Sequence, residues 1–143
     1  MKIRKSMLPV LRPEGGQEEI DALAGVIKSG WGGKDPLVAK FEKEFAEMVG
    51  AKYAVAVTSN SHGQDLVMKA LDIKDGDVIN PTISFMATAM IPLWQPNITT
   101  NVVDVDPINM NIDPEAVRKA ITPNTKAVIA VNEAGVPAPI DEI

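Results

Sequence analysis

The chain has 143 residues, no cysteine and a formal net charge of -5. These values exclude disulfides and thiolate chemistry, and the excess of carboxylates argues against a nucleic-acid-binding surface. A hydrophobic content of 45% with 23% charged residues is typical of a globular protein, and a chain of this length can bury a substantial core. No apolar run approaches the ~20 residues of a membrane span. We therefore expect a cytoplasmic protein that binds neither membranes nor nucleic acid.

The N-terminal part of the sequence predicts an extended leader and two helices. Prolines and a glycine pair indicate that residues 1–16 are extended and end in a turn. Residues 17–29 place apolar side chains on one face, which predicts an amphipathic helix. A second apolar stripe follows Asp35-Pro36, a good pair for a helix start, and continues until Gly50.

A glycine-rich loop around Trp31 separates these two helices. The segment GWGGK lacks the spacing and the ending of a phosphate-binding P-loop. Two interpretations stay open for it, a mobile loop and a contact to a ligand.

Residues 53–71 predict a strand, a tight polar turn and a helix. The strand is expected at 53–58, where YAVAVT alternates, and the helix at 64–71. The turn, SNSHG, carries hydroxyl and amide side chains where the helix begins. The first backbone N–H groups of a helix lack partners and its dipole is positive there, so such a turn suits a phosphate. Serine and asparagine also cap helices in general, and a simple cap is the alternative.

Three further strands and two further helices are expected in the rest of the chain. The sequence predicts strands at 78–80, 99–106 and 126–131, and helices at 85–94, capped by Ser84, and from Asp113-Pro114 to Ala120. Strands that alternate with helices imply an α/β fold with a parallel sheet. Ligands of such sheets bind at the carboxyl ends of the strands. Three segments are expected to meet at that edge: 59–63, 82–85 and 132–135.

The chemical groups of the sequence exclude several classes of site. His62 is the only histidine and the chain has no cysteine, so no metal site is expected. Neither a GxSxG elbow nor a GxGxxG fingerprint is present, which argues against hydrolases and dinucleotide-binding enzymes. Asp104 and Asp106 are two close carboxylates, but acidic residues at a strand end that leads into a turn are common.

Several segments, taken in order, carry a resemblance to a known family. They are EEIDALAGVIKSGWGGKDPLVAKFEKEFAEMVGAKYAVAVTSNS, KALDIKDGDVINPTISFMATA, VVDVDPINMNIDPEAVRKAITPNTKAVIAV and GVPAPIDEI. The series resembles the N-terminal part of the DegT/DnrJ/StrS family of sugar aminotransferases, which use pyridoxal 5'-phosphate (PLP). The resemblance implies a partial large domain of the aspartate-aminotransferase fold (fold type I), with a mostly parallel sheet and flanking helices. Residues 1–143 would be the N-terminal part of that domain, and the small C-terminal domain would be absent.

The resemblance also implies which residues contact the cofactor and the substrate. The phosphate-binding turn of the family falls on Asn60, Ser61 and His62. The aromatic residue that stacks on the pyridine ring falls on Phe85, for which a place in the core is the alternative. Trp31 falls in the substrate region, and Asn132 stands where the family usually has a His-Leu-Tyr-Gly type sequence. An asparagine there is suited to bond the ring hydroxyl of the cofactor or a substrate.

The function that the resemblance implies is transfer of an amino group, typically from glutamate, to a keto group on a nucleotide-linked sugar by a homodimer. PLP chemistry needs a lysine for the Schiff base and an acidic residue at the pyridine nitrogen. In the family both lie beyond position 143, so we expect a truncated fragment without catalytic residues, inactive alone. One alternative is a binding or interaction module, or split-enzyme half, that self-associates or complements a second chain. Another is an unrelated phosphate-binding α/β domain.

Overall fold

The computed structural model describes residues 7, 12, 14–30 and 36–143. The chain divides into two compact units, Met1–Ala56 and Val57–Ile143, which we describe one at a time. The leader predicted at 1–16 lies mostly outside the described residues, and Trp31 lies outside them as well.

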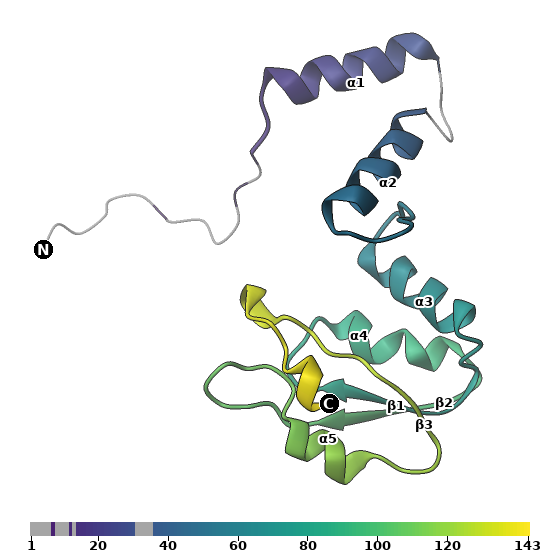
Figure 1. The fold of residues 1–143 in the computed structure, drawn as a ribbon, viewed down its shortest axis with the longest axis vertical. Helices are drawn as coiled ribbons and strands as arrows, with labels where there is room; N and C mark the ends of the chain where they lie inside the picture. The colour runs from purple at the N-terminus through teal and green to yellow at the C-terminus, as the bar shows by residue number, and fades with distance from the viewer. Residues whose placement is uncertain (1–6, 8–11, 13, 31–35) are drawn as a thin grey trace, which may run out of the picture. The chain divides into compact units, whose positions relative to one another are not determined.

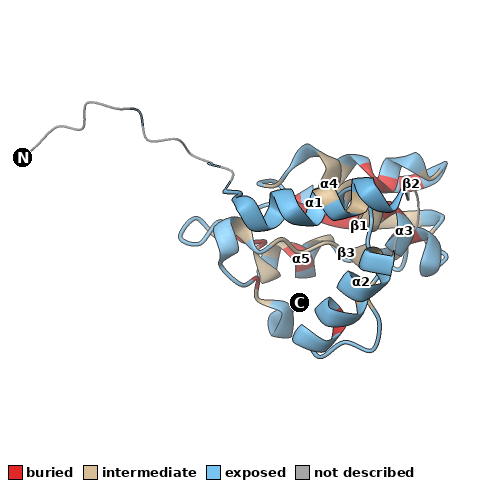
Figure 2. Ribbon diagram, turned by 90° about the horizontal axis from the view of Figure 1, so that it is seen from above, coloured by how far each residue is buried: buried red, intermediate tan, exposed pale blue. Residues whose placement is uncertain are grey.

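The first unit holds the two predicted helices, α1 (Gln17–Ser29) and α2 (Pro36–Met48). The chain turns after α2 at Gly50, whose φ of +69° lies in the left-handed region that glycine adopts without strain. Of the residues that form these two helices, Ala46 alone is buried (Figure 2). The apolar stripes that the sequence predicts are therefore largely exposed, including the neighbouring rings of Phe41 and Phe45.

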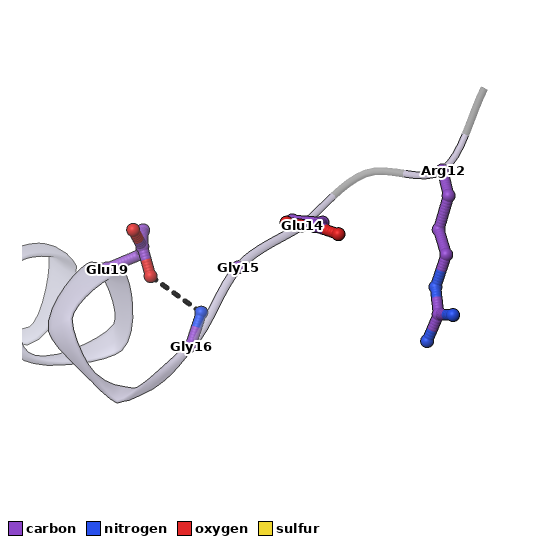
Figure 3. Close-up of a pocket in the computed structure, with 5 residues that line it drawn as sticks. All are labelled: Arg12, Glu14, Gly15, Gly16 and Glu19. Atoms are coloured by element: carbon purple, nitrogen blue, oxygen red, sulfur yellow. Dashed lines mark hydrogen bonds between the residues drawn. The ribbon is translucent and has the colours of Figure 1, made fainter.

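The first turn of α1 is held by the side chain of Glu19. Its Oε2 accepts a hydrogen bond from the backbone N–H of Gly16 over 2.6 Å (Figure 3). A full capping box has a second bond, in which the N-cap side chain accepts from the backbone of the helix. Gly16 has no side chain, so only the bond to Glu19 can form. It also lowers the pKa of Glu19, because the ionised carboxylate is the better acceptor. An open hollow of about 520 Å³ lies beside this turn, lined by Arg12, Glu14, Gly15, Gly16 and Glu19.

The strand predicted at 53–58 is not formed. These residues carry no ladder bonds to another strand among the described residues. The backbone N–H of Ala56 donates instead to Oε1 of Glu42, at 2.9 Å. An alternating Val and Ala pattern suits a pleated strand, but a strand exists only with a partner to pair with. The prediction was wrong because a local pattern says nothing about that partner.

The second unit is built on a three-stranded parallel sheet, which confirms the predicted fold class. Its strands are β1 (Asp75–Pro81), β2 (Asn97–Val103) and β3 (Thr125–Val128), in the order β2-β1-β3. β1 and β2 pair without interruption from end to end, whereas the β1–β3 register shifts between Asp77 and Val78. β3 ends at Val128, short of the predicted residue 131.

Helices cover both faces of this sheet. Ile79 packs with Val103, Ile112 and Val117 on the face of α5 (Pro114–Ala120). Its neighbour in β1, Val78, packs with Met68 and Ile98 on the face of α3 (Asn60–Ala70). Figure 1 shows α5 on one side of the strands and α3 and α4 (Met86–Met90) on the other. Successive side chains of a strand point to opposite faces, and so β1 contributes to both clusters.

The helix predicted at 85–94 is broken in two. α4 ends at Met90, and a 3-10 turn, η1 (Pro92–Trp94), follows it. Pro92 has no N–H to continue the α-helical bonds. Ser84 does not cap α4 as predicted; Phe85 holds the cap position, and the Ser84 hydroxyl donates to Oγ1 of Thr88. Two more 3-10 turns, η2 (Glu133–Gly135) and η3 (Ile140–Glu142), follow β3.

Candidate functional site

The N-terminus of α3 presents free hydrogen-bond donors. Ser59 is its N-cap: the Ser59 hydroxyl oxygen accepts from the backbone N–H of His62 at 3.3 Å, and the Ser59 carbonyl accepts from that of Gly63. The backbone N–H groups of Asn60 and Ser61 have no partner within the part of the chain that the structure describes. The same holds for the hydroxyl of Ser61. The helix starts at residue 60 rather than 64, and these donors at its N-terminus are available to a ligand.

The ring of His62 is tied back to the residues before the helix. Its Nδ1 lies 2.6 Å from Oγ1 of Thr58 and 3.1 Å from Oγ of Ser59. The side chain thus fixes the conformation of the turn. The backbone N–H of His62 is also the donor that the cap already uses.

Gln64, in α3, makes a contact that the sequence did not predict. Its Nε2 donates to Oδ1 of Asn60 at 2.7 Å, one helical turn away. Its own Oε1 is buried and has no partner among the described residues. An i, i+4 pair of amides is the sequence signal that would have found this contact. The bond holds the Asn60 side chain along the helix.

Phe85 lies at the end of the segment that connects β1 to α4. It follows the carboxyl end of β1 by a few residues and its side chain is 78% exposed. A place in the core, the alternative for this residue, is therefore wrong. An aromatic ring that is exposed at the carboxyl edge of a parallel sheet is available for stacking on a flat ligand.

Asn132 lies in the loop that follows β3. Its Oδ1 accepts a hydrogen bond from the backbone N–H of Ala138 at 2.9 Å. Its side-chain amide donor has no partner among the residues described here. Asn132 is exposed, so this donor is open to solvent or to a ligand.

The structure brings two of these three segments to one edge of the second unit. β1 and β3 are parallel neighbours, so the segments after them, 82–85 and 132–135, leave the sheet on the same side. Asn60 and Gly63, at the start of α3, line a hollow together with Ile129 and Ala130, which follow β3. The residues of 82–85 and 132–135 do not line this hollow, so the convergence of 59–63, 82–85 and 132–135 stays a prediction.

Other kinds of site find little in the described residues. No three His, Asp or Glu side chains among them gather to hold a metal ion. None of the helices that the structure describes is long and apolar enough to cross a membrane. Asp106 serves a turn, as its Oδ1 accepts from the backbone N–H groups of Ile108 and Asn109.

Comparison with known proteins identifies relatives of this arrangement. The model of the DegT/DnrJ/EryC1/StrS aminotransferase family matches residues 13–143. The chain is similar to 3-amino-5-hydroxybenzoic acid synthase, with 34% identity and a TM-score of 0.84 over 91% of this chain and 34% of that one. It is also similar to the Escherichia coli GDP-4-keto-6-deoxy-D-mannose-3-dehydratase with bound hydrated PLP, with 30% identity and a TM-score of 0.86 over 94% and 36%.

A third solved structure, the aminotransferase from Psychrobacter cryohalolentis, is 32% identical, with a TM-score of 0.83 over 91% of this chain and 33% of that one. The chain thus spans about a third of the length of the proteins that it matches.

Proposed function

Because the chain belongs to the DegT/DnrJ/EryC1/StrS aminotransferase family, we propose that it supplies the N-terminal part of the large PLP-binding domain of a sugar aminotransferase. The family uses PLP, and the fold is a partial fold type I large domain. The observation that carries the proposal is the start of α3, where N–H donors without a partner among the described residues lie beside the segment that follows β3.

The start of α3 fits the phosphate of the cofactor. The N–H groups of Asn60 and Ser61 and the hydroxyl of Ser61 are donors without a partner in the described part of the chain. Such groups at the positive end of a helix bind a phosphate dianion well. His62 would act by holding the turn through Thr58 and Ser59 rather than by giving another donor.

Phe85 and Asn132 would hold the rest of the cofactor. Phe85 offers its exposed ring to the pyridine face, and the Asn132 amide would donate to the ring hydroxyl or to a substrate. When bound, PLP supplies an electron sink for the carbon that bears the amino group. Trp31, which lies outside the described residues, would contact the substrate.

We further propose that this chain alone does not transfer amino groups. PLP enzymes carry the cofactor on a lysine. In the second unit, Lys69 donates to Oδ2 of Asp65 in the middle of α3, and Lys126 lies at the amino end of β3, 3.8 Å from Asp75. Neither lysine belongs to the segments that form the candidate site. The catalytic lysine of the active enzyme would then come from a segment outside these 143 residues.

The substrate class that we propose is a nucleotide-linked keto sugar, with glutamate as the typical amino donor. The similarity to an enzyme named for GDP-4-keto-6-deoxy-D-mannose supports it. The lack of cysteine suits the reducing cytoplasm, where we place the protein.

Titration with PLP, followed by absorbance and calorimetry, tests the cofactor site. We expect saturable binding that Ser61→Ala weakens about tenfold, because a hydrogen bond to a charged group is lost. Phe85→Ala removes a stacking contact and is expected to weaken binding severalfold.

Matched controls are Ser29→Ala and Phe41→Ala, which remove the same side chains at positions that are not part of the three site segments, and we expect them to leave the affinity unchanged. A folded chain that does not bind PLP, or binding that both site variants leave intact, would refute the proposed cofactor site.

A second candidate function is that of a split-enzyme half or an interaction module. Within the described residues, β3 is paired with β1 only, and an apolar hollow of about 520 Å³ lies between α3 and β3. Unpaired strand edges and exposed apolar faces promote association. The chain would then self-associate, as in a homodimer, or complement a second chain that carries the lysine.

A further inference from the structure

The loop that carries Asn132 has little regular structure of its own. Two successive residues of η2, Ala134 and Gly135, have positive φ angles, +49° and +84°. Backbone-to-backbone hydrogen bonds within the loop join neighbours only, from Gly135 to Asn132 and from Val136 to Glu133. A loop of this kind needs bonds from elsewhere to keep one conformation.

Those bonds come from a single buried side chain, Asn111, which is 1% exposed. Its Oδ1 accepts from the backbone N–H of Glu133 at 3.0 Å. Its Nδ2 lies 3.2 Å from the carbonyl of Val136 and 3.1 Å from that of Pro137. One carboxamide therefore bonds the loop at both ends, across more than 20 positions of sequence.

Asn111 is itself held firmly on its own side. Its backbone N–H donates to Oδ1 of Asn109 at 2.9 Å, and its carbonyl accepts from the N–H of Asp106 at 2.8 Å. The next residue, Ile112, forms a bridge with Val105 and packs in the core against α5. The side chain thus projects from a fixed base, and each of its polar atoms is satisfied.

We propose that Asn111 is a positioning residue, which acts through Asn132. Its bond to Glu133, the residue after Asn132, and its bonds to Val136 and Pro137 fix the loop so that the Asn132 amide stays at the carboxyl edge of the sheet. The bond from Ala138 to Oδ1 of Asn132 closes the same loop. The inference rests on the proposed function, since it assigns Asn132 a ligand to bind.

The substitution Asn111→Leu tests it, because leucine keeps the branching and the number of side-chain heavy atoms and loses all three bonds. Asn111→Asp is the second variant: it keeps the acceptor for Glu133 and loses the donor to the two carbonyls. We expect amide hydrogen exchange at Glu133 and Ala138 to rise about tenfold or more in Asn111→Leu. At Glu133 the rise should be smaller in Asn111→Asp. Ile98→Ala, in the core cluster on the other face of the sheet, is the control for a general loss of stability.

PLP affinity supplies the readout that a purely structural role would not move. Asn111→Leu should weaken PLP binding severalfold in the wild-type background and have no further effect on Asn132→Ala. Ile98→Ala should leave the affinity unchanged. An equal loss in both backgrounds would overturn the inference.

The two proposals fail differently. A wild-type chain that does not bind PLP refutes the cofactor site, while exchange at Glu133 and Ala138 that stays at the wild-type rate in Asn111→Leu refutes the role of Asn111. If Asn111→Leu does not fold, the exchange pattern of Asn111→Asp decides.

Discussion

Gly76 is the residue at which the amino end of β1 meets the loop before β3. Its φ is +89°, and a Cβ at this position would lie 2.4 Å from the carbonyl oxygen of Asn124. That oxygen accepts the N–H of Asp77 at 3.0 Å, so it has little room to move. We expect Gly76→Ala to lower the free energy of unfolding by about 2–3 kcal/mol, from the left-handed backbone and the displaced carbonyl together. Urea denaturation measures this change in the free energy of unfolding.

Gly63→Ala is the matched control for this prediction. Gly63 lies in α3, and its added Cβ would meet Cγ2 of Val57 at 3.5 Å, an ordinary contact. Because alanine favours a helix over glycine by up to about 1 kcal/mol, this variant should be neutral or more stable. If both variants lose the same stability, close packing at Gly76 is not the cause.

At the level of single residues, the sequence predicts those that act locally. Asp113 was predicted at a helix start, and its side chain accepts the expected backbone bond. Ser59 was predicted in a turn before a helix at 64 and instead caps a helix that begins at 60, while Ser84 is not the cap of α4. Asn111 was not predicted, because its partners lie more than 20 positions away and an asparagine among turn residues resembles any other. The contacts made by Phe85 and Asn132 to a cofactor stay predictions.

At the level of the element, the capping bond of α1 makes its first turn sensitive to pH. The bond from Gly16 lowers the pKa of Glu19 below its usual 4.5. A carboxyl whose pKa is lower in the folded than in the unfolded state stabilises the fold above the unfolded value, and the effect is lost as pH falls through the folded value. We expect the amide proton shift of Gly16, followed by NMR, to titrate with a midpoint below 4.5.

Glu19→Gln is the control, since glutamine can accept the same bond and does not titrate in this range. In that variant the Gly16 shift should no longer follow the pH between about 2 and 5. A Gly16 amide that is equally insensitive to pH in the wild type would show that the bond is not populated in solution.

The elements differ in how far their sequence determines them. α1, α2 and α5 follow from apolar spacing and turn residues that lie within each segment. The strand expected at 53–58 needed a partner that the described residues do not provide, and Pro92 broke a helix whose apolar pattern continued past it. Periodicity gives the type of an element, while pairing and proline decide whether it forms and where it ends.

At the level of the whole molecule, the parallel arrangement of the strands follows from the order of the elements. The meeting of three segments at one edge is what that order predicts. Strands that alternate with helices leave few other topologies. The order of the strands within the sheet did not follow, because it depends on contacts between segments far apart in sequence. β1 lies in the centre, and its neighbours β2 and β3 are edge strands of the sheet that the structure describes.

The last prediction concerns the edge strand β3 and the hollow between it and α3. The hollow is apolar, and two side chains of α3 at its rim, Val67 and Leu71, are 56% and 65% exposed. Burying such groups stabilises a complex by roughly 25 cal/mol per Å² before the entropy of association is subtracted. We therefore expect the chain to associate with itself in sedimentation velocity at micromolar concentration.

Charge at the hollow should oppose this association. Val67→Glu places a carboxylate that would lose its water in the interface, so the dissociation constant should rise at least tenfold. Ile108→Glu adds the same charge at a loop residue that is 90% exposed and lies outside the hollow, and it should change nothing. Equal weakening by both variants would indicate that net charge, rather than this surface, controls association. A chain that stays monomeric at every concentration would contradict the expected self-association. Of the two forms of association proposed, only binding to a second chain would then remain for this surface.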